Sequence, residues 1–208
     1  MNPTRALLPI ALVCSLLAPA AARADEAAPA VSVPTFANAT CPIMGKPASL
    51  KLFVDTEMGR MYVCCPPCMA KIKKDVATAY KVAYPTTKKA GNTVCPVTGK
   101  PLDDKAVTIL LQGYEIGLSS ADAIPAARAD SQITLVKATN PKVVDVGNRT
   151  CPINGQPVVA NAFALVGNDL IRLSSPAAVD EVRKDPAKAL KAAKDIAAAQ
   201  AAPTAPAK

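Results

Sequence analysis

Short apolar runs separated by turns recur along the chain and predict three β-hairpins. The paired runs are 50–54 with 60–63, 106–111 with 114–118, and 162–166 with 169–173. Each pair is rich in Val, Ile, Leu and aromatic residues, and the connections DTEMG, QG and GN are typical of hairpin turns. The chain therefore contains three similar two-stranded elements rather than one long sheet.

Helical patterns follow the hairpins. After the first hairpin, apolar residues recur at helical spacing at Met69, Ile72, Val76 and Tyr80. After the third, the segment 174–193 predicts a helix with Ser175 as N-cap and Pro176 at the first helical position. After the second, Pro125 interrupts the pattern, which predicts a short helix only.

A turn motif precedes each hairpin and shows that the three elements are repeats. The segments NATCPIMGKPA, NTVCPVTGKPL and NRTCPINGQPV begin at residues 38, 92 and 148, and their cysteines, Cys41, Cys95 and Cys151, lie 54 and 56 residues apart. A regular period of this size is typical of repeated supersecondary units. The pattern C-P-[IV]-x-G-[KQ]-P predicts a tight turn, here called the knuckle, in which Gly adopts a positive φ.

The predicted fold class is α+β, with three tandem knuckle, hairpin and helix units of treble-clef-like form. We assign the first unit to residues 37–85, a degenerate second unit to 91–139 and a degenerate third unit to 143–196. Val143, Val144 and Val146 predict a further strand leading into the third unit. Residues 25–36 and the Ala- and Pro-rich end 197–208 lack a core-forming pattern, and we expect a disordered linker and a disordered tail.

The first 24 residues read as a signal peptide. Arg5 precedes the apolar run 6–17, and small residues end in Ala22-Arg23-Ala24, an A-x-A cleavage site. We expect the exported chain to begin at Asp25 and to be periplasmic or secreted. The apolar run is too short to span a membrane, which needs about 20 apolar residues, and no other stretch comes close. Six cysteines remain once Cys14 leaves with the signal.

Composition argues against several classes of function. The formal net charge is +8, or +6 without the signal peptide's two arginines, and the basic residues are scattered. Aromatic residues make up 3% of the chain and Trp is absent, so we do not expect the protein to bind nucleic acid. The chain has no His for general-base catalysis and no phosphate-binding glycine loop, and we expect no enzyme.

Sulfur is concentrated in the first unit. Ser174 follows Cys151 by 23 residues, as Cys64 follows Cys41. In this register the first unit's Cys64, Cys65 and Cys68 become Ser174, Ser175 and Ala178 in the third unit and Ser119, Ser120 and Ala123 in the second. All four methionines after the signal peptide, Met44, Met58, Met61 and Met69, also lie in the first unit. The scaffold is repeated, but the thiols are not.

The spacing C-x-x-M…C-C-x-x-C predicts a metal site of Cys41, Met44, Cys64, Cys65 and Cys68. The hairpin returns the chain, bringing the knuckle to the helix N-terminus, where the helix dipole favours thiolates. Cysteine with methionine selects Cu(I), whereas thioethers are poor ligands for zinc. Cu(I) is thus the first candidate, with Met44 in or near the coordination shell, and Zn²⁺ held by four thiolates is the second.

CPIMGKP, followed by a hairpin and YVCCPPCMAKIKKD, resembles the YHS/TRASH-type metal-binding domain. The resemblance covers residues 38 to about 84; the later units match only the opening and the hairpin. It implies heavy-metal binding or sensing, with Cys41, Cys64 and Cys68 at ligand positions and Met44 at the second knuckle position. Cys65 stands where that family often has Ser. The implied role is sequestration, delivery to a protein partner, or sensing.

Two other interpretations remain open. The CPPC segment 65–68 is a C-x-x-C motif at a helix start, typical of thiol–disulfide chemistry, although a repeated hairpin is not a thioredoxin-like context. Exported cysteines are also often oxidised, and a Cys95–Cys151 disulfide between equivalent positions competes with two buried thiols that pack as hydrophobic residues. If only the first unit binds metal, we expect the degenerate units to supply bulk, a core that the first unit is too small to supply alone, or a docking surface.

Overall fold

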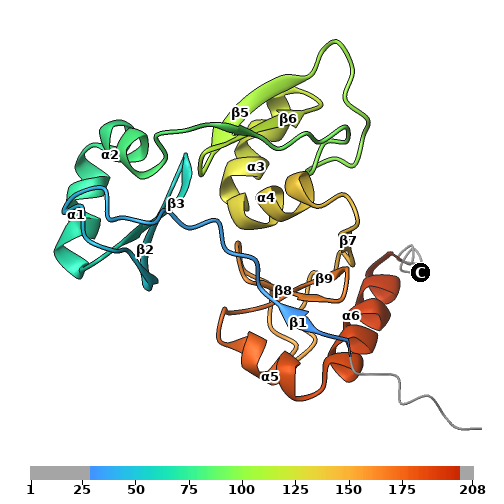
Figure 1. Ribbon diagram of the computed structural model, residues 1–208. Coiled ribbons are helices and arrows are strands. Elements are labelled where there is room, and N and C mark those ends of the chain that lie inside the picture. The colour runs from blue at the N-terminus through green and yellow to red at the C-terminus, as the bar shows by residue number, and fades with distance from the viewer. Residues whose placement is uncertain (1–28, 202–208) are drawn as a thin grey trace, which may run out of the picture.

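The computed structural model describes residues 29–201 (Figure 1). The predicted signal peptide, the first residues of the linker and the end of the tail lie outside this range. Within it, six α-helices, one 3-10 helix and three separate sheets confirm the α+β class. In the same range, no helix combines the length and apolar character needed to cross a membrane.

The first unit contains one hairpin and two short helices. Strands β2 (Ser49–Thr56) and β3 (Gly59–Val63) pair antiparallel, as the sequence predicts. The predicted helix is divided into α1 (Pro66–Lys74) and α2 (Val76–Ala83). The break falls at Asp75, whose carboxylate accepts a hydrogen bond from the Thr78 N–H at 3.0 Å and thereby caps α2.

The second unit is more helical than the sequence predicts. Its hairpin, β5 (Val107–Leu111) with β6 (Tyr114–Leu118), is joined by β4 (Lys88–Lys89), which runs parallel to β6. The 3-10 helix η1 (Ala121–Ala123) and helices α3 (Ile124–Ala129) and α4 (Ser131–Thr139) follow. Pro125 does not break a helix here, because it occupies the first turn of α3, where its missing N–H costs no hydrogen bond.

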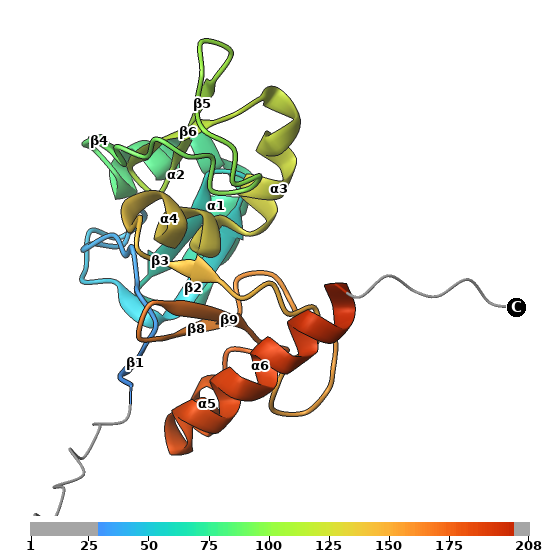
Figure 2. The ribbon, with the colours of Figure 1, turned by 90° about the vertical axis from the view of Figure 1, so that its right-hand side faces the viewer.

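The third unit repeats this order. Strands β8 (Phe163–Val166) and β9 (Asp169–Arg172) form the hairpin, and the predicted additional strand is β7 (Val144–Asp145), parallel to β9. Helices α5 (Ala178–Lys184) and α6 (Pro186–Ala201) cover one side of this sheet (Figure 2). The N-cap assignment of Ser175 is wrong, since α5 begins at Ala178. Residues 197–201, assigned to the disordered tail, belong to α6.

The segment before the first unit is ordered against the third unit. Strand β1 (Val31–Ser32) pairs antiparallel with β8, giving the sheet order β1-β8-β9-β7. Val31 and Val33 pack against the apolar core of the third unit. The prediction of a disordered linker is therefore wrong for this stretch, because a partner strand distant in sequence satisfies its backbone groups.

Helix α4 lies at the centre of the molecule. Its residues are buried on nearly all sides, and one face joins the apolar side chains of the third sheet in a shared cluster of Ile133, Val136, Phe163, Leu165 and Leu170. Arg172 of β9 binds Asp130, just before α4, and Asp145 of β7, each at 2.8 Å. The second and third units thus share a core and an ion-pair network.

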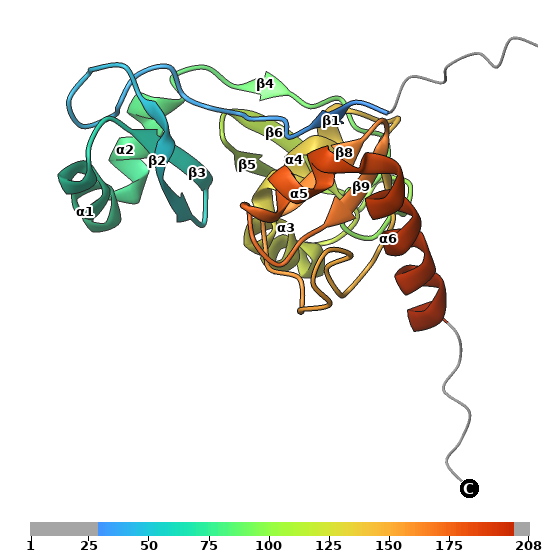
Figure 3. The same cartoon turned by 90° about the horizontal axis from the view of Figure 1, so that it is seen from below.

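The first unit is attached to the second through the turn of the β5–β6 hairpin. The backbone N–H of Gln112 donates to the Met58 carbonyl, and its side-chain oxygen accepts from the Arg60 N–H. The Gly113 N–H donates to the Tyr80 hydroxyl at 2.9 Å. Figure 3 shows the first unit at one end of the molecule and the other two packed together. The cysteine-rich unit is therefore held by hydrogen bonds at one edge and has a core of its own.

Candidate metal centre

The knuckle fixes Cys41 at the base of a closed turn. The Cys41 N–H donates to the Lys46 carbonyl at 2.7 Å, and the Gly45 N–H donates to the Cys41 carbonyl at 2.9 Å. Gly45 has a φ of 65°, and the equivalent Gly99 and Gly155 have 72° and 70°, which confirms the predicted turn. Residues with a Cβ resist this conformation, so the glycine is required for the chain to fold back beneath the cysteine.

An asparagine side chain holds the returning strand beside the knuckle. Asn38 donates from Nδ2 to the Tyr62 carbonyl at 2.9 Å and accepts from the Tyr62 N–H at 2.8 Å. Its Nδ2 also donates to the Thr40 carbonyl at 2.8 Å. We call this arrangement the asparagine clamp. Because Tyr62 lies two residues before Cys64, the clamp sets the distance between Cys41 and Cys64.

The positioning role of Asn38 was not predicted from the sequence, although a signal for it was present. Asn occurs three residues before each knuckle cysteine, at Asn38, Asn92 and Asn148. Asn92 binds both backbone groups of Gly117, and Asn148 binds both those of Arg172, with the same geometry. A side-chain amide mimics the peptide group and can therefore replace a strand neighbour. The repeated N-x-x-C spacing is therefore the sequence pattern that indicates this positioning role.

The start of α1 supplies the remaining thiols. Cys65 is the N-cap, with extended φ and ψ of −157° and 157°, and Pro66 occupies the first turn. The helix then carries Cys68 inward, where its side chain is 2% exposed. Lys71 and the lysines of the last turn lie beyond the thiols and complement the helix dipole.

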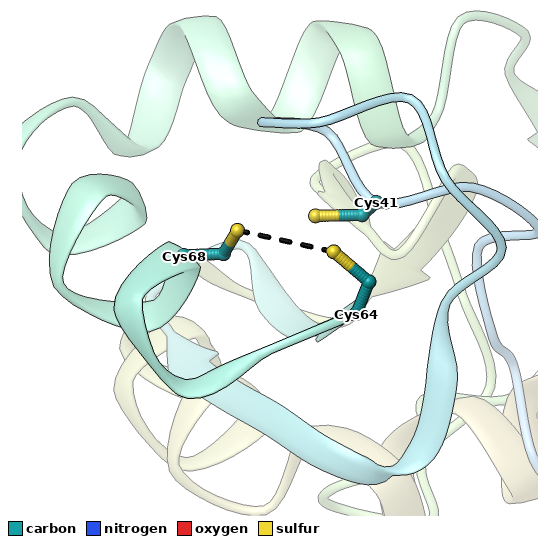
Figure 4. Close-up of side chains that lie close together, drawn as sticks. All are labelled: Cys41, Cys64 and Cys68. Atoms are coloured by element: carbon teal, nitrogen blue, oxygen red, sulfur yellow. Dashed lines mark hydrogen bonds between the residues drawn. The ribbon is translucent and has the colours of Figure 1, made fainter.

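Three thiols from three different elements meet. The Sγ atoms of Cys41 in the knuckle, Cys64 at the end of β3 and Cys68 in α1 all lie within 4.8 Å of one another, and they point toward a common space (Figure 4). The Sγ atoms of Cys64 and Cys68 are 4.0 Å apart. Three sulfurs placed around one ion at a bond length of about 2.3 Å would be about 4 Å apart. The group therefore fits a three-coordinate ion with little adjustment.

The other two predicted site residues lie at the margin of this group. The half-buried Cys65 has its Sγ 3.8 Å from that of Cys64 and 3.2 Å from that of Cys68, but it is not part of the three-thiol group around Cys41. Met44 is 51% exposed. Its backbone N–H donates a hydrogen bond to the Cys41 sulfur. The placement of Met44 as a ligand through its thioether stays a prediction.

Hydrogen bonds make Cys41 the most acidic thiol of the three. Burial alone would raise the pKa of Cys41, but backbone N–H groups of Cys64, Ile43 and Met44 donate to its sulfur and bring the pKa down from 9.0 to about 7. Burial raises the pKa of Cys68 to about 12, and it also raises that of Cys64. Cys41 is therefore the first of the three thiols to ionise, and an incoming cation would displace the protons that remain on the group.

Hydroxyl and amide groups replace the thiol contacts in the other two units. The Thr98 and Ser119 hydroxyls, at the positions of Met44 and Cys64, lie 3.0 Å apart, within hydrogen-bond distance. In the third unit the Asn154 side-chain amide donates to the Ser174 hydroxyl at 3.0 Å. The knuckle and the hairpin end are thus joined by a direct hydrogen bond in these units. In the first unit, thiol groups stand at this junction instead.

The remaining cysteines are structural. All six cysteines of residues 29–201 are free thiols, and Cys95 and Cys151 are fully buried in the cores of their own units. The structure therefore favours the second of the two predictions for this pair, buried thiols that pack as hydrophobic residues, over a Cys95–Cys151 disulfide.

The donor set is composed of sulfur alone. Within the described residues, the three-thiol group includes neither a carboxylate nor an imidazole. Thiolate sulfur is a soft ligand that binds Cu(I) and Zn²⁺ in preference to Mg²⁺ or Ca²⁺. No protein-family model, curated protein or solved structure matches this chain. The candidate centre is accordingly defined by the geometry and chemistry of Cys41, Cys64 and Cys68.

Proposed function

We propose that the first unit binds one thiophilic metal ion, Cu(I) in preference to Zn²⁺, through Cys41, Cys64 and Cys68. The observation that carries the proposal is the convergence of three sulfurs from a turn, a strand end and a helix within 4.8 Å. The resemblance of residues 38–84 to the YHS/TRASH-type domain supports it, as does the absence of equivalent thiols at Ser174 and Ala178.

The number of thiols in the group favours Cu(I). Structural zinc sites are almost always four-coordinate, whereas soft thiolate ligands select Cu(I) as well as zinc. A fourth thiolate for zinc would have to come from Cys65, which would need to move toward Cys41. Cu(I) needs no such movement if it takes three ligands, and Met44, a half-exposed residue of the knuckle, is a candidate accessory ligand.

The position of the site suits an ion that is exchanged. Cys41 and Cys68 are buried, but Cys64 and Cys65 are half-exposed and give the ion a route to solvent or to a protein partner. Sequestration, delivery or sensing outside the cytoplasm agrees with this exposure and with the predicted signal peptide. In this account each unit is treble-clef-like, and the two degenerate units provide the body to which the metal-binding unit is attached.

Metal uptake by the reduced chain from Asp25 onward tests the proposal. The protein is equilibrated with Cu(I) and Zn²⁺ without oxygen, and the bound metal is counted by native mass spectrometry. We expect one Cu(I) per chain, loss of binding in Cys68→Ser, and unchanged binding in the control Cys151→Ser. If the wild type binds neither ion but turns over disulfides through Cys65 and Cys68, the thiol–disulfide interpretation replaces this one.

A further inference from the structure

The thiol of Cys65 lies against the proposed metal ligands without belonging to their group. Its Sγ is 3.2 Å from that of Cys68, a shorter separation than the 4.0 Å between Cys64 and Cys68 or the 3.8 Å between Cys64 and Cys65. A disulfide requires about 2.0 Å between sulfurs. Cys65 and Cys68 are thus about 1 Å from bonding distance, and side-chain rotation alone can close a gap of this size.

The local backbone leaves Cys65 free for this approach. As the N-cap of α1, Cys65 makes no side-chain capping hydrogen bond, so no interaction with the helix end must be broken. Cys68 follows in the first turn, with its N–H donating to the Cys65 carbonyl at 3.2 Å. Two cysteines in this relationship, C-x-x-C at a helix start, form disulfides without distorting the helix.

We propose that Cys65 and Cys68 form a disulfide on oxidation and that this reaction expels the bound metal ion. The inference rests on the proposed function, because Cys68 is one of the three ligands. The chemical class of the oxidant is a disulfide, from a small molecule or from a thiol–disulfide oxidoreductase. The pair is therefore a covalent modification site that controls metal release.

The exchange balances in two steps. The Cys65 thiol gives up its proton and attacks the reagent's disulfide. The reagent's S–S bond breaks, a mixed disulfide forms, and one reagent thiolate leaves and takes up the proton. The Cys68 sulfur then leaves the metal as a thiolate and attacks the Cys65 sulfur, and the second reagent thiol leaves. The two cysteines lose two electrons, the reagent gains them, and Cu(I) departs without a change in oxidation state.

Exposure sets the order of these steps. Cys64 and Cys65 are both partly exposed, whereas Cys41 and Cys68 are 0% and 2% exposed. Of the two accessible thiols, Cys65 alone lies outside the three-thiol group, so it is the one that an incoming disulfide finds unbound to metal. Once Cys68 is consumed, Cys41 and Cys64 alone remain of the three ligands. The equivalent residues in the other units are Ser120 with Ala123 and Ser175 with Ala178, so the reaction is confined to the first unit.

The experiment oxidises the Cu(I)-loaded chain from Asp25 onward with oxidised glutathione, without oxygen and with a chromogenic Cu(I) chelator present. We expect one Cu(I) released for each disulfide formed, a mass loss of two hydrogens, and a Cys65–Cys68 link in the peptide map. Cys65→Ser should load one Cu(I) and keep it under oxidation. The serines at the equivalent positions of the other units indicate that this variant folds. Cys95→Ser should behave as the wild type.

Failure of the inference differs from failure of the proposed function. Cu(I) that stays bound after oxidation, a disulfide that maps to another pair, or equal release from Cys65→Ser would each overturn the inference while leaving the metal site intact. A reduced wild type that binds no Cu(I) would overturn the proposed function, and the release reaction with it.

Discussion

The side-chain amide of Asn38 pairs with both backbone groups of Tyr62, at 2.9 and 2.8 Å. This relationship links the knuckle to strand β3, which ends just before Cys64, and it recurs as Asn92 with Gly117 and Asn148 with Arg172. In the first unit the clamp holds two thiols at a fixed separation. In the other units it joins a knuckle that keeps its cysteine, Cys95 or Cys151, to a serine at the position of Cys64. The clamp is therefore part of the scaffold on which the metal site is built.

Asn38→Ala should destabilise the first unit and weaken Cu(I) binding together. The substitution removes three hydrogen bonds to the backbone of Thr40 and Tyr62 and a longer one, at 3.5 Å, from the Tyr84 hydroxyl. The side chain is 4% exposed, so the Tyr62 backbone groups lose these partners in a buried setting. Such a loss costs about 1–3 kcal/mol of unfolding free energy. Urea denaturation and competition with a Cu(I) chelator measure the two effects.

The matched control is Asn148→Ala in the third unit. It should lower stability by a similar amount, because Asn148 makes the same three hydrogen bonds to backbone groups, but it should leave the Cu(I) affinity unchanged. Equal loss of affinity in both variants would show that the clamp acts through global stability, and the positioning role of Asn38 would be withdrawn.

Met44→Ala should retain one Cu(I) per chain with a reduced affinity. Three thiolates complete a three-coordinate site, and the half-exposed thioether is at most an additional contact. Chelator competition gives the affinity, and Thr98→Ala, at the same knuckle position of the second unit, is the control. Complete loss of binding in Met44→Ala would instead make the thioether an essential ligand.

Thiols introduced into the third unit should create a second site. Cys151 is already present in a knuckle of the same geometry, so Ser174→Cys with Ala178→Cys restores the set equivalent to Cys41, Cys64 and Cys68. Native mass spectrometry should then count two Cu(I) per chain, and adding Cys151→Ser should return the count to one. A count that stays at one in the double variant would mean that the scaffolds are not equivalent.

Acid should weaken the contact between the second and third units. Although burial raises the pKa of Asp145, the adjacent Arg172 and Lys137 lower it to below its usual 3.8. A carboxyl group with a lowered pKa in the folded state stabilises the protein above pH 3.8, and that contribution is lost as the pH falls through the folded-state pKa.

Asp145→Asn should therefore lower stability at neutral pH and flatten the acid limb of the stability profile below about pH 4. Urea denaturation between pH 2 and 7 measures this. The control is Asp180→Asn, whose partner Arg183 and own carboxylate are both largely exposed, and which should change little. If Asp145→Asn loses stability in acid as steeply as the wild type, the ion pairs of Asp145 are not the cause of that loss.

The hairpins and knuckles could be predicted from the sequence because local features determine them. Strand pairs are marked by apolar runs and short turns, and the knuckle depends on one glycine whose positive φ at Gly45 matches the expectation. It could not be predicted that residues 31–32 form the ordered strand β1, because Val31 pairs with Val166, which is far away in the sequence. Non-local pairing of a two-residue strand leaves almost no pattern in the sequence.

The candidate site was predicted in outline, and the structure separates its members. Spacing and repetition pointed to five residues, Cys41, Met44, Cys64, Cys65 and Cys68, and the structure groups the thiols of Cys41, Cys64 and Cys68. Spacing cannot distinguish Cys64 from Cys65, because adjacent residues in extended backbone point to opposite sides, and only the backbone conformation decides which sulfur faces Cys41. The exposure of Met44 likewise depends on how the turn packs, which the motif does not record.

X-ray absorption at the copper edge of the Cu(I)-loaded chain reports the type, number and distance of the ligands. If Cys41, Cys64 and Cys68 hold the ion, the copper should have three sulfur neighbours at about 2.3 Å, and fewer in Cys41→Ser. Copper bound by nitrogen or oxygen atoms, or a sulfur shell that Cys41→Ser leaves unchanged, would contradict this ligand assignment.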